Sequence, residues 1–405
     1  MSAEVNGQRR AAWGGEGASR AGRDRRPAQS LYGALDLGTN NCRLLVARPA
    51  GDGFRVVDAF SRIVRLGEGL AASGELSAPA MARTIEALKI CSRKLRRRGV
   101  TRIRAVATEA CRRATNCEDF LDAVRRSTGI ELEIISQNEE AALAICGCAP
   151  LIDPAIPDIL LFDIGGGSTE ICWLKAAPGA PQNGAGSGGT QNGGRQAVEL
   201  SLHAWLSVPV GVITLAESHA AERHGAQRHG GEDGAAAFRA MEAETAAAVA
   251  GFAARVASEG PLVRGAVQML GTSGTVTTLA GVQMNLPRYD RAAVDGSYLE
   301  MAAVHDLCAR IAAMSHAERA AHPCIGPERA DLVVAGCAIL SALARLWPAD
   351  RLRVADRGLR EGMLYAMIHG VSAPAGRWLP EPETRPEADS DPGLNPDSAA
   401  LAASR

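Results

Sequence analysis

Two segments of the chain place an aspartate, a glycine-rich turn and small polar side chains in the same order. The first, LDLGTNNCRLL, carries Asp36 followed by Gly38, Thr39 and Asn40. The second, FDIGGGSTEI, carries Asp163 followed by Gly165, Gly166, Gly167 and Ser168. Successive N–H groups exposed at tight glycine turns bind anions, so both segments are candidate phosphate loops. Each turn leads into strand-forming residues, whereas P-loops and dinucleotide-binding turns open a helix, so neither of those motifs is predicted.

The carboxylates of these segments are suitable oxygen ligands for a hard cation. Asp36 and Asp163 could hold such a cation directly or through water and so neutralise a bound phosphate. Two ordinary hairpins with aspartate as a turn residue are the alternative. A single motif would favour that alternative, but the recurrence about 130 residues later favours a phosphate site.

A third cluster, rich in glycine and threonine, follows the apolar strand AVQML and precedes a helix. An anion can bind at such a strand-to-helix loop, although the signal is weak when it stands alone. Its first five residues complete the predicted phosphate site: Gly271, Thr272, Ser273, Gly274 and Thr275.

Cleavage of a phosphoanhydride also needs a base that orients water, and positive charge around the transferred phosphoryl group. The candidate bases are Glu139, Glu140 and Glu170, but adjacent glutamates at a helix start usually serve the helix dipole. The candidate cations, each of which could equally form a surface ion pair, are Arg43, Arg112, Arg113, Arg329 and Arg360.

The composition excludes several classes of protein. The chain has 405 residues, of which 46% are hydrophobic and 22% charged, with a formal net charge of −1. This length allows two cores, and the near-neutral charge argues against a protein that coats nucleic acid. No apolar run reaches the roughly 18–20 residues of a membrane helix, and no secretory signal precedes Leu31. The ten cysteines are dispersed without a C-x-x-C pair, so buried free thiols in a reducing cytoplasm are predicted, and a zinc site is not.

Low-complexity stretches interrupt the ordered part of the chain. Residues 1–30 are predicted to form a disordered basic tail, and residues 372–405 a second disordered tail. A glycine-rich surface insert is predicted at about 176–197. His224 and His229 lie in another glycine-rich stretch, where solvated histidines are expected more than metal ligands.

Hydrophobic spacing predicts alternating strands and helices between these stretches. Strands are expected at Leu31–Leu35 and Cys42–Arg48, helices at Ala78–Arg98 and Asn116–Arg126, and a further helix that opens at Glu139. The repeated strand–aspartate–turn–strand unit predicts two domains of like topology that face each other across a cleft. The bounds assigned to them are residues 31–138 and 139–371.

Eight segments occur here in one order: LDLGTNNCRLLV, ATEACRRATN, IISQNEEA, FDIGGGSTEI, PVGVITLAE, GTSGTVTTLAG, IGPERADLVVAGCAIL and DRGLREGML. This series, between Leu31 and Gly370, resembles the exopolyphosphatase and guanosine pentaphosphate phosphohydrolase family of the actin–Hsp70–sugar kinase superfamily. The resemblance implies an α/β fold of two RNase H-like domains with the active site in the interdomain cleft. It further implies that Glu140 is the catalytic base, that Arg112 contacts the bound phosphate chain, and that Glu170 positions metal or water.

The activity implied by the resemblance is hydrolysis of the terminal phosphoanhydride of inorganic polyphosphate, with Mg²⁺ as cofactor and K⁺ as a stimulating ion. Hydrolysis of guanosine pentaphosphate is the alternative at the same site. A nucleotide-binding, actin-like assembly protein without turnover is the alternative of another class. A homodimer in the cytoplasm is expected, with no membrane and no specific nucleic acid as partner.

Two departures from the family pattern qualify this expectation. The first loop often reads Ser-Asn-Ser in the family and reads Thr39-Asn40-Asn41 here. The side chains remain hydrogen-bond donors, but the third donor is of a different type. The sequence also lacks the additional C-terminal domains of longer members, which favours shorter polyphosphates or nucleotides over very long chains.

Overall fold

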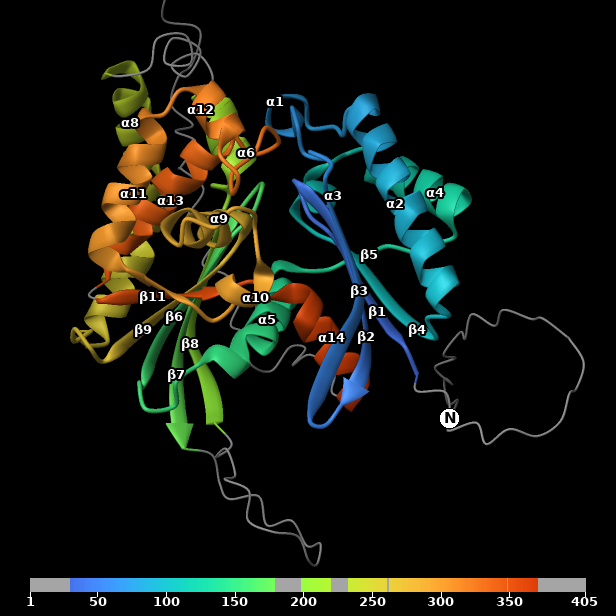
Figure 1. Cartoon of the computed structure of the whole chain (residues 1–405), viewed down its shortest axis with the longest axis horizontal. Coiled ribbons are helices and arrows are strands. Elements are labelled where there is room, and N and C mark those ends of the chain that lie inside the picture. Colours follow the sequence, from blue (N-terminus) through green and yellow to red (C-terminus); the bar gives the residue numbers. More distant parts are fainter. Residues whose placement is uncertain (1–29, 179–197, 220–231, 261, 348, 371–405) are drawn as a thin grey trace, which may run out of the picture.

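The computed structural model describes residues 30–178, 198–219, 232–260, 262–347 and 349–370. Nearly all of both predicted tails and of the glycine-rich insert lies outside these residues, and so do His224 and His229. Two β-sheets, each with its own helices, lie side by side in the described part (Figure 1).

The first sheet has five strands in the order β3-β2-β1-β4-β5. Its central strand β1 pairs antiparallel with β2, which in turn pairs with β3, and it pairs parallel with β4, which continues to β5. The strands are β1 (Tyr32–Leu37), β2 (Asn41–Ala50), β3 (Gly53–Ile63), β4 (Arg102–Ala107) and β5 (Glu133–Ile134).

The second sheet has six strands in the order β10-β11-β9-β6-β7-β8. Its strand β6 pairs antiparallel with β7 and parallel with β9, as β1 does with β2 and β4. This common topology confirms the predicted α/β fold with two related units. The strands are β6 (Asp158–Ile164), β7 (Thr169–Pro178), β8 (Val198–Val208), β9 (Val267–Thr272), β10 (Tyr298–Glu300) and β11 (Arg351–Ala355).

Helices α2 (Ala78–Arg98) and α4 (Cys117–Thr128) cover one face of the first sheet, and the short helices α1 (Leu70–Ser73) and α3 (Glu109–Arg113) lie at its edge (Figure 1). Helix α2 has the bounds that hydrophobic spacing predicts. Its first turn is capped by Ser77, whose hydroxyl accepts from the Ala80 amide, and Gly99 ends it in the left-handed region with φ 65°.

A larger apolar core lies between one face of the second sheet and the helices that cover it. These helices are α6 (Val212–Ser218), α8 (Glu232–Ser258), α9 (Gly274–Gln283), α10 (Arg291–Val294), α11 (Met301–Ala313), α12 (His316–Ala321) and α13 (Val333–Leu346). Among the described residues, no helix combines the length and the apolarity that crossing a bilayer requires. All ten cysteines are described and carry free thiols, nine of them buried, as the prediction of buried free thiols expects.

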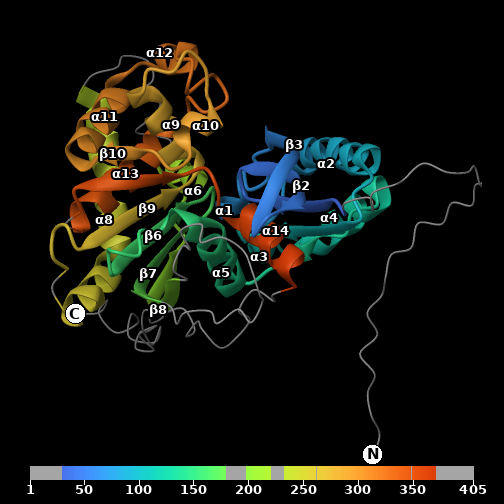
Figure 2. The same cartoon turned by 60° about the horizontal axis from the view of Figure 1, so that its bottom comes forward.

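Helices α5 (Gln137–Cys148) and α14 (Leu359–His369) pack against each other between the two sheets, and a 3-10 turn at Ala149–Leu151 follows α5 (Figures 1 and 2). A Cβ atom on Gly147 would lie 2.0 Å from the Gly358 carbonyl oxygen, and one on Gly362 would lie 2.0 Å from the Leu143 carbonyl oxygen. The backbones of the two helices therefore meet at a distance that only glycine allows.

Helix α14 returns the end of the described chain to the first sheet. Its Leu359 and Met363 share a core with Tyr32 and Ala34, on the sheet face opposite α2 and α4. The sequence-based division instead grouped this helix with the second domain. Helix α14, together with Leu143 of α5, buries this apolar face of β1 and β2 away from water.

Candidate active site

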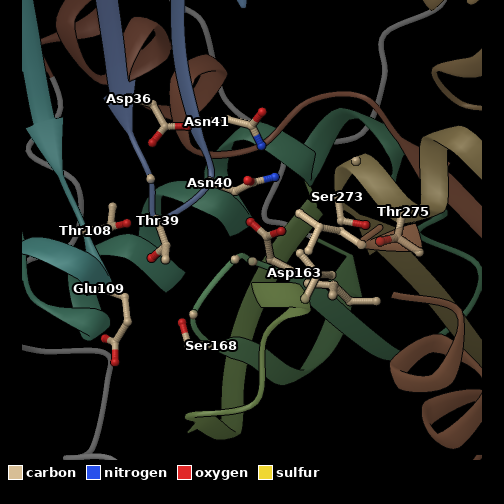
Figure 3. A pocket seen from close by; sticks show the side chains of 18 of the residues that line it. Asp36, Thr39, Asn40, Asn41, Thr108, Glu109, Asp163, Ser168, Ser273 and Thr275 are labelled. Carbon is tan, nitrogen blue, oxygen red and sulfur yellow. The ribbon is translucent and has the colours of Figure 1, made fainter. Parts of the chain in front are cut away.

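A cavity of about 990 Å³, including its open mouth, lies between the two sheets. Figure 3 shows side chains from both aspartate hairpins and from the first turn of α9 around one space. The cavity is lined by most of the residues that the sequence singled out: Asp36, Gly38, Thr39, Asn40, Glu140, Asp163, Gly165, Gly166, Gly167, Ser168, Glu170, Ser273, Gly274 and Thr275.

The two hairpin turns have the same internal hydrogen bond. The Gly38 amide donates to the Asn41 carbonyl at 2.9 Å, and the Gly165 amide donates to the Ser168 carbonyl at 2.9 Å. None of the glycines in these turns has a positive φ. A Cβ atom on Gly166 would lie 3.0 Å from the Asn40 backbone nitrogen, so glycine is needed here because the two turns meet each other.

The start of α6 holds the second turn in place. The amides of Val212 and Ile213 donate to the carbonyls of Gly165 and Gly166 at 3.0 and 2.8 Å. A Cβ atom on Gly211 would lie 2.5 Å from the Gly166 carbonyl, so this approach also requires glycine. The segment PVGVITLAE therefore fixes the orientation of the second candidate phosphate loop.

The structure places only part of the third cluster, the one rich in glycine and threonine, at the cavity. Ser273, Gly274 and Thr275 begin α9 and line the cavity, and the Ser273 hydroxyl caps the helix by accepting from the Val276 amide at 3.0 Å. Gly271 lies within β9, where an added Cβ would meet the Phe162 ring at 2.6 Å, and it does not line the cavity, so phosphate binding by this residue stays a prediction. Thr272 donates to the Arg357 carbonyl at 2.8 Å and borders a smaller cavity.

Asp36 and Asp163 occupy matching positions, one residue before the ends of β1 and β6. Neither carboxylate makes a hydrogen bond or ion pair within the described part of the chain. Burial raises the pKa of Asp36, and burial together with the nearby Glu140 raises the pKa of Asp163 to about 7. Arg43 opposes both shifts. A divalent cation between the two aspartates would favour their charged forms.

The donor set fits Mg²⁺ better than a metal held by protein alone. Within the described residues, no group of three His, Cys, Asp or Glu side chains could hold a metal ion. Mg²⁺ typically keeps several waters and uses one or two carboxylates plus substrate phosphate oxygens, which suits Asp36 and Asp163. The third predicted ligand, Glu170, accepts hydrogen bonds from the hydroxyls of Ser168 and Ser207 at 2.7 and 2.9 Å.

The structure separates the two adjacent glutamates at the start of α5. Glu139 pairs with Arg104 at 2.5 Å and does not line the cavity, whereas Glu140 lines it. Burial, reinforced by the charge of Glu170, raises the pKa of Glu140 to about 8, although Arg112 opposes this shift. A carboxylate with such a pKa is well suited to accept a proton near neutral pH.

Arg112 donates to Glu140 at 2.8 Å, to Glu109 at 2.9 Å and to the Ile135 carbonyl at 2.9 Å. It is absent from the residues that line the cavity, and its contact with a phosphate chain stays a prediction. Its guanidinium instead holds the Glu140 carboxylate in place. Burial of this ion pair makes such positioning stronger than at an exposed site.

Two other arginines face the cavity. Arg43 makes no hydrogen bond or ion pair within the described residues, and Arg329 donates to the Thr278 hydroxyl at 2.7 Å. Burial and the neighbouring Arg43 lower the pKa of Arg329. Arg113 is exposed, and buried Arg360 borders the smaller cavity. The cavity therefore has two arginines available to an anion.

Four polar lining residues were not singled out as ligands by sequence reasoning: Asn41, Thr108, Glu109 and Thr278. Each lies within one of the segments quoted from the sequence, so considering every polar side chain of those segments would have found them. The Asn40 side-chain oxygen is buried without a hydrogen-bond partner, which marks a position where a ligand or water is needed.

Comparison with known proteins agrees with this geometry. The Ppx/GppA phosphatase family profile matches residues 45–370. The chain belongs to this family. Its members are phosphatases by description, and the resemblance inferred from the ordered segments is thereby confirmed.

Solved structures of the Ppx/GppA phosphatase family share the fold. A crystal structure of the Aquifex aeolicus family member is 25% identical, with a TM-score of 0.61, and the match covers 84% of this chain and 98% of that one. A type II variant from Aquifex aeolicus is 26% identical, with a TM-score of 0.58 and coverage of 83% and 99%. An exopolyphosphatase from Cytophaga hutchinsonii is 23% identical, with a TM-score of 0.69 and coverage of 85% and 99%.

Proposed function

We propose that the protein is an exopolyphosphatase that removes the terminal phosphoryl group of inorganic polyphosphate. The observation that carries this proposal is the position of Glu140, which lines the same cavity as both glycine turns and both aspartates. A binding protein without turnover has no need of a carboxylate whose pKa is raised to about 8 at that place.

In this proposal the residues of the site have separate roles in an in-line hydrolysis. Glu140 accepts a proton from water while the water oxygen bonds to the terminal phosphorus, and the bond from that phosphorus to the bridging oxygen breaks. The shortened chain leaves with the bridging oxygen, and orthophosphate is the other product. Arg112 keeps Glu140 in position through their 2.8 Å ion pair.

The charge that develops on the phosphoryl oxygens is met by fixed donors. These are the N–H groups of the two glycine turns, the first turn of α9, and the guanidinium groups of Arg43 and Arg329. Asp36 and Asp163 are the residues that would hold Mg²⁺. Bound Mg²⁺ would neutralise and orient the phosphate oxygens.

The lining favours polyphosphate over a guanosine nucleotide. No aromatic side chain is among the described residues that line the cavity, so a purine base has no ring to stack on. The few apolar lining residues are aliphatic: Ile164, Val212, Leu332, Val333 and Leu359. A linear chain of phosphates needs only the donors and cations that are present.

Orthophosphate release from polyphosphate, guanosine pentaphosphate and ATP, measured in parallel with Mg²⁺, tests the proposal. We expect the highest kcat/KM with polyphosphate. Glu140→Gln should lower kcat by roughly 10²–10⁴-fold. The adjacent Glu139→Gln is the matched control and should change kcat less than ~2-fold, since Glu139 pairs with Arg104 away from the cavity.

Each other outcome has a distinct meaning. Faster release from guanosine pentaphosphate would replace the proposed substrate but keep the site. No release from any substrate, combined with tight nucleotide binding, would support the assembly protein and overturn the enzyme. Full turnover by Glu140→Gln would remove Glu140 as the base.

A further inference from the structure

A second, smaller cavity of about 340 Å³ adjoins the first. The aspartate pair lies at the boundary between them, since both cavities are lined by Asp36, Arg43, Asp163, Ser273 and Leu359. The far side of the smaller cavity is formed by the residues that connect β11 to α14 and by the first turn of α14. No function described so far uses this space.

Arg360 is the unusual residue of the second cavity. Only 9% of it is exposed to solvent, yet it makes no hydrogen bond or ion pair with any described residue. A buried guanidinium without direct partners is costly, and it usually indicates a bound anion or a water network. Burial lowers the pKa of Arg360 further, which is the direction expected for an uncompensated positive charge.

The acidic side chains near Arg360 already have partners. Glu361 pairs with Arg291 at 2.6 Å and accepts from the Gly358 amide at 2.9 Å. Asp356 accepts from the Tyr289 hydroxyl at 2.6 Å and lies 3.4 Å from Arg291. Both carboxylates therefore pair directly with Arg291 and not with Arg360, although the charge of Glu361 partly offsets the lowering of the Arg360 pKa by burial.

The first turn of α14 adds neutral donors. The backbone amides of Leu359 and Arg360 make no hydrogen bond within the described part of the chain, and this eleven-residue helix directs its positive end toward the second cavity. Two unpaired amides and one buried guanidinium at the start of the same helix together resemble an anion site.

We propose that the second cavity binds the orthophosphate product after it is released from the chain end. This inference rests on the proposed function. In this proposal the remaining polyphosphate chain extends through the open mouth of the first cavity, so that orthophosphate formed at the inner end leaves by another route. The second cavity lies directly beyond the aspartate pair. Arg43 lines both cavities and Arg360 lines the second, so each can bind the product as it moves from one cavity to the other.

The charges predict that this binding requires the cation. The second cavity is lined by three arginines, Arg43, Arg357 and Arg360, and by four carboxylates, Asp36, Asp163, Asp356 and Glu361. Mg²⁺ at the aspartate pair would change this local balance from −1 to +1, which attracts orthophosphate, whereas without Mg²⁺ the carboxylates repel it.

Direct binding of inorganic orthophosphate to the full chain, measured by calorimetry with Mg²⁺ and without polyphosphate, tests the inference. Arg360→Gln should weaken this binding at least ~10-fold, since it removes a charge-assisted hydrogen bond. Arg113→Gln, which changes an exposed arginine, is the matched control and should bind orthophosphate as the unaltered protein does. Unchanged orthophosphate binding by Arg360→Gln would overturn the inference.

A second measurement remains informative where Arg360→Gln does not fold. In the unaltered protein, orthophosphate should inhibit polyphosphate hydrolysis noncompetitively, because the two occupy different cavities. Purely competitive inhibition would overturn the second cavity as the product site. If polyphosphate is not hydrolysed at all, the proposed function fails, and the binding measurement still decides whether the second cavity takes orthophosphate.

Discussion

The two aspartate hairpins have the same backbone but opposite charges at the neighbouring cross-strand position. Asp36 is paired across β1 and β2 with Arg43, whereas Asp163 is paired across β6 and β7 with Glu170. Residues directly opposite each other in an antiparallel pair project from the same face, so both partners accompany their aspartate to the cavity. The repeat thus supplies one hairpin that attracts anions and one that concentrates carboxylates.

The carboxylate-rich hairpin has the larger effect on proton and cation chemistry. The pKa of Glu170 is raised to about 7 by burial and by Asp163, and the charge of Glu170 in turn raises the pKa of Glu140. On the other hairpin, Arg43 lowers the pKa of both aspartates from the values that burial alone would give. The comparison teaches that duplicated backbones can acquire separate roles through a single cross-strand residue.

The largest expected effect is that of Asp163→Asn, which should lower kcat by about 10³-fold or more, because it removes a charged cation ligand beside the base. Activity should be measured across a range of Mg²⁺ concentrations, since higher Mg²⁺ should restore part of it. Asp158→Asn, at the other end of β6, is the control and should leave kcat within ~2-fold. Near-normal activity of Asp163→Asn would show that the second hairpin does not hold the cation.

Arg43→Gln should have the next largest effect. Loss of the guanidinium that faces the substrate is expected to lower kcat/KM for polyphosphate by roughly 10²-fold, mainly through KM. Steady-state kinetics at several ionic strengths will separate this local effect from general screening. Arg62→Gln alters an exposed arginine on the adjacent strand β3 and should change kcat/KM little. Equal losses in the two variants would mean that the first hairpin attracts anions only through overall charge.

Glu170→Gln should be milder, with a loss of about 10-fold, because the amide still accepts a hydrogen bond from a serine hydroxyl. Its more specific effect is on pH dependence. Removing the Glu170 charge lowers the pKa of Glu140, so the base loses its proton at lower pH and the acidic limb of the kcat profile should move to lower pH. A profile that does not move would show that the two hairpins are electrostatically independent.

The smallest expected effect is on stability. Glu140, Asp163 and Glu170 have folded-state pKa values of about 7 to 8, above their ordinary values. The folded chain therefore binds more protons than the unfolded one, and stability is lost as the pH rises through this range. Without Mg²⁺, Tm should fall by a few degrees between pH 5.5 and 8.5, and Glu140→Gln should reduce the fall. A Tm that rises over this interval would contradict the carboxylate cluster.

The sequence was sufficient for the features that depend on local pattern. The repeated hairpins, the bounds of α2 and the position of Glu140 beside the turns follow from residue types, spacing and the ordered segments. Pairings between distant segments were not predictable from one sequence. Nothing local says that α14 covers the first sheet, that Glu139 pairs with Arg104 while Glu140 faces the cavity, or that Gly271 lies against Phe162.

The helix that completes the first sheet is made last among the described elements. Tyr32 and Leu359, which share one core, are 327 positions apart, so at typical synthesis rates roughly 15–65 s separate their appearance at the ribosome. During that interval the nascent first sheet lacks the part of its apolar cover that α14 supplies. The core of the N-terminal sheet can therefore be completed only after the last described helix has been synthesised.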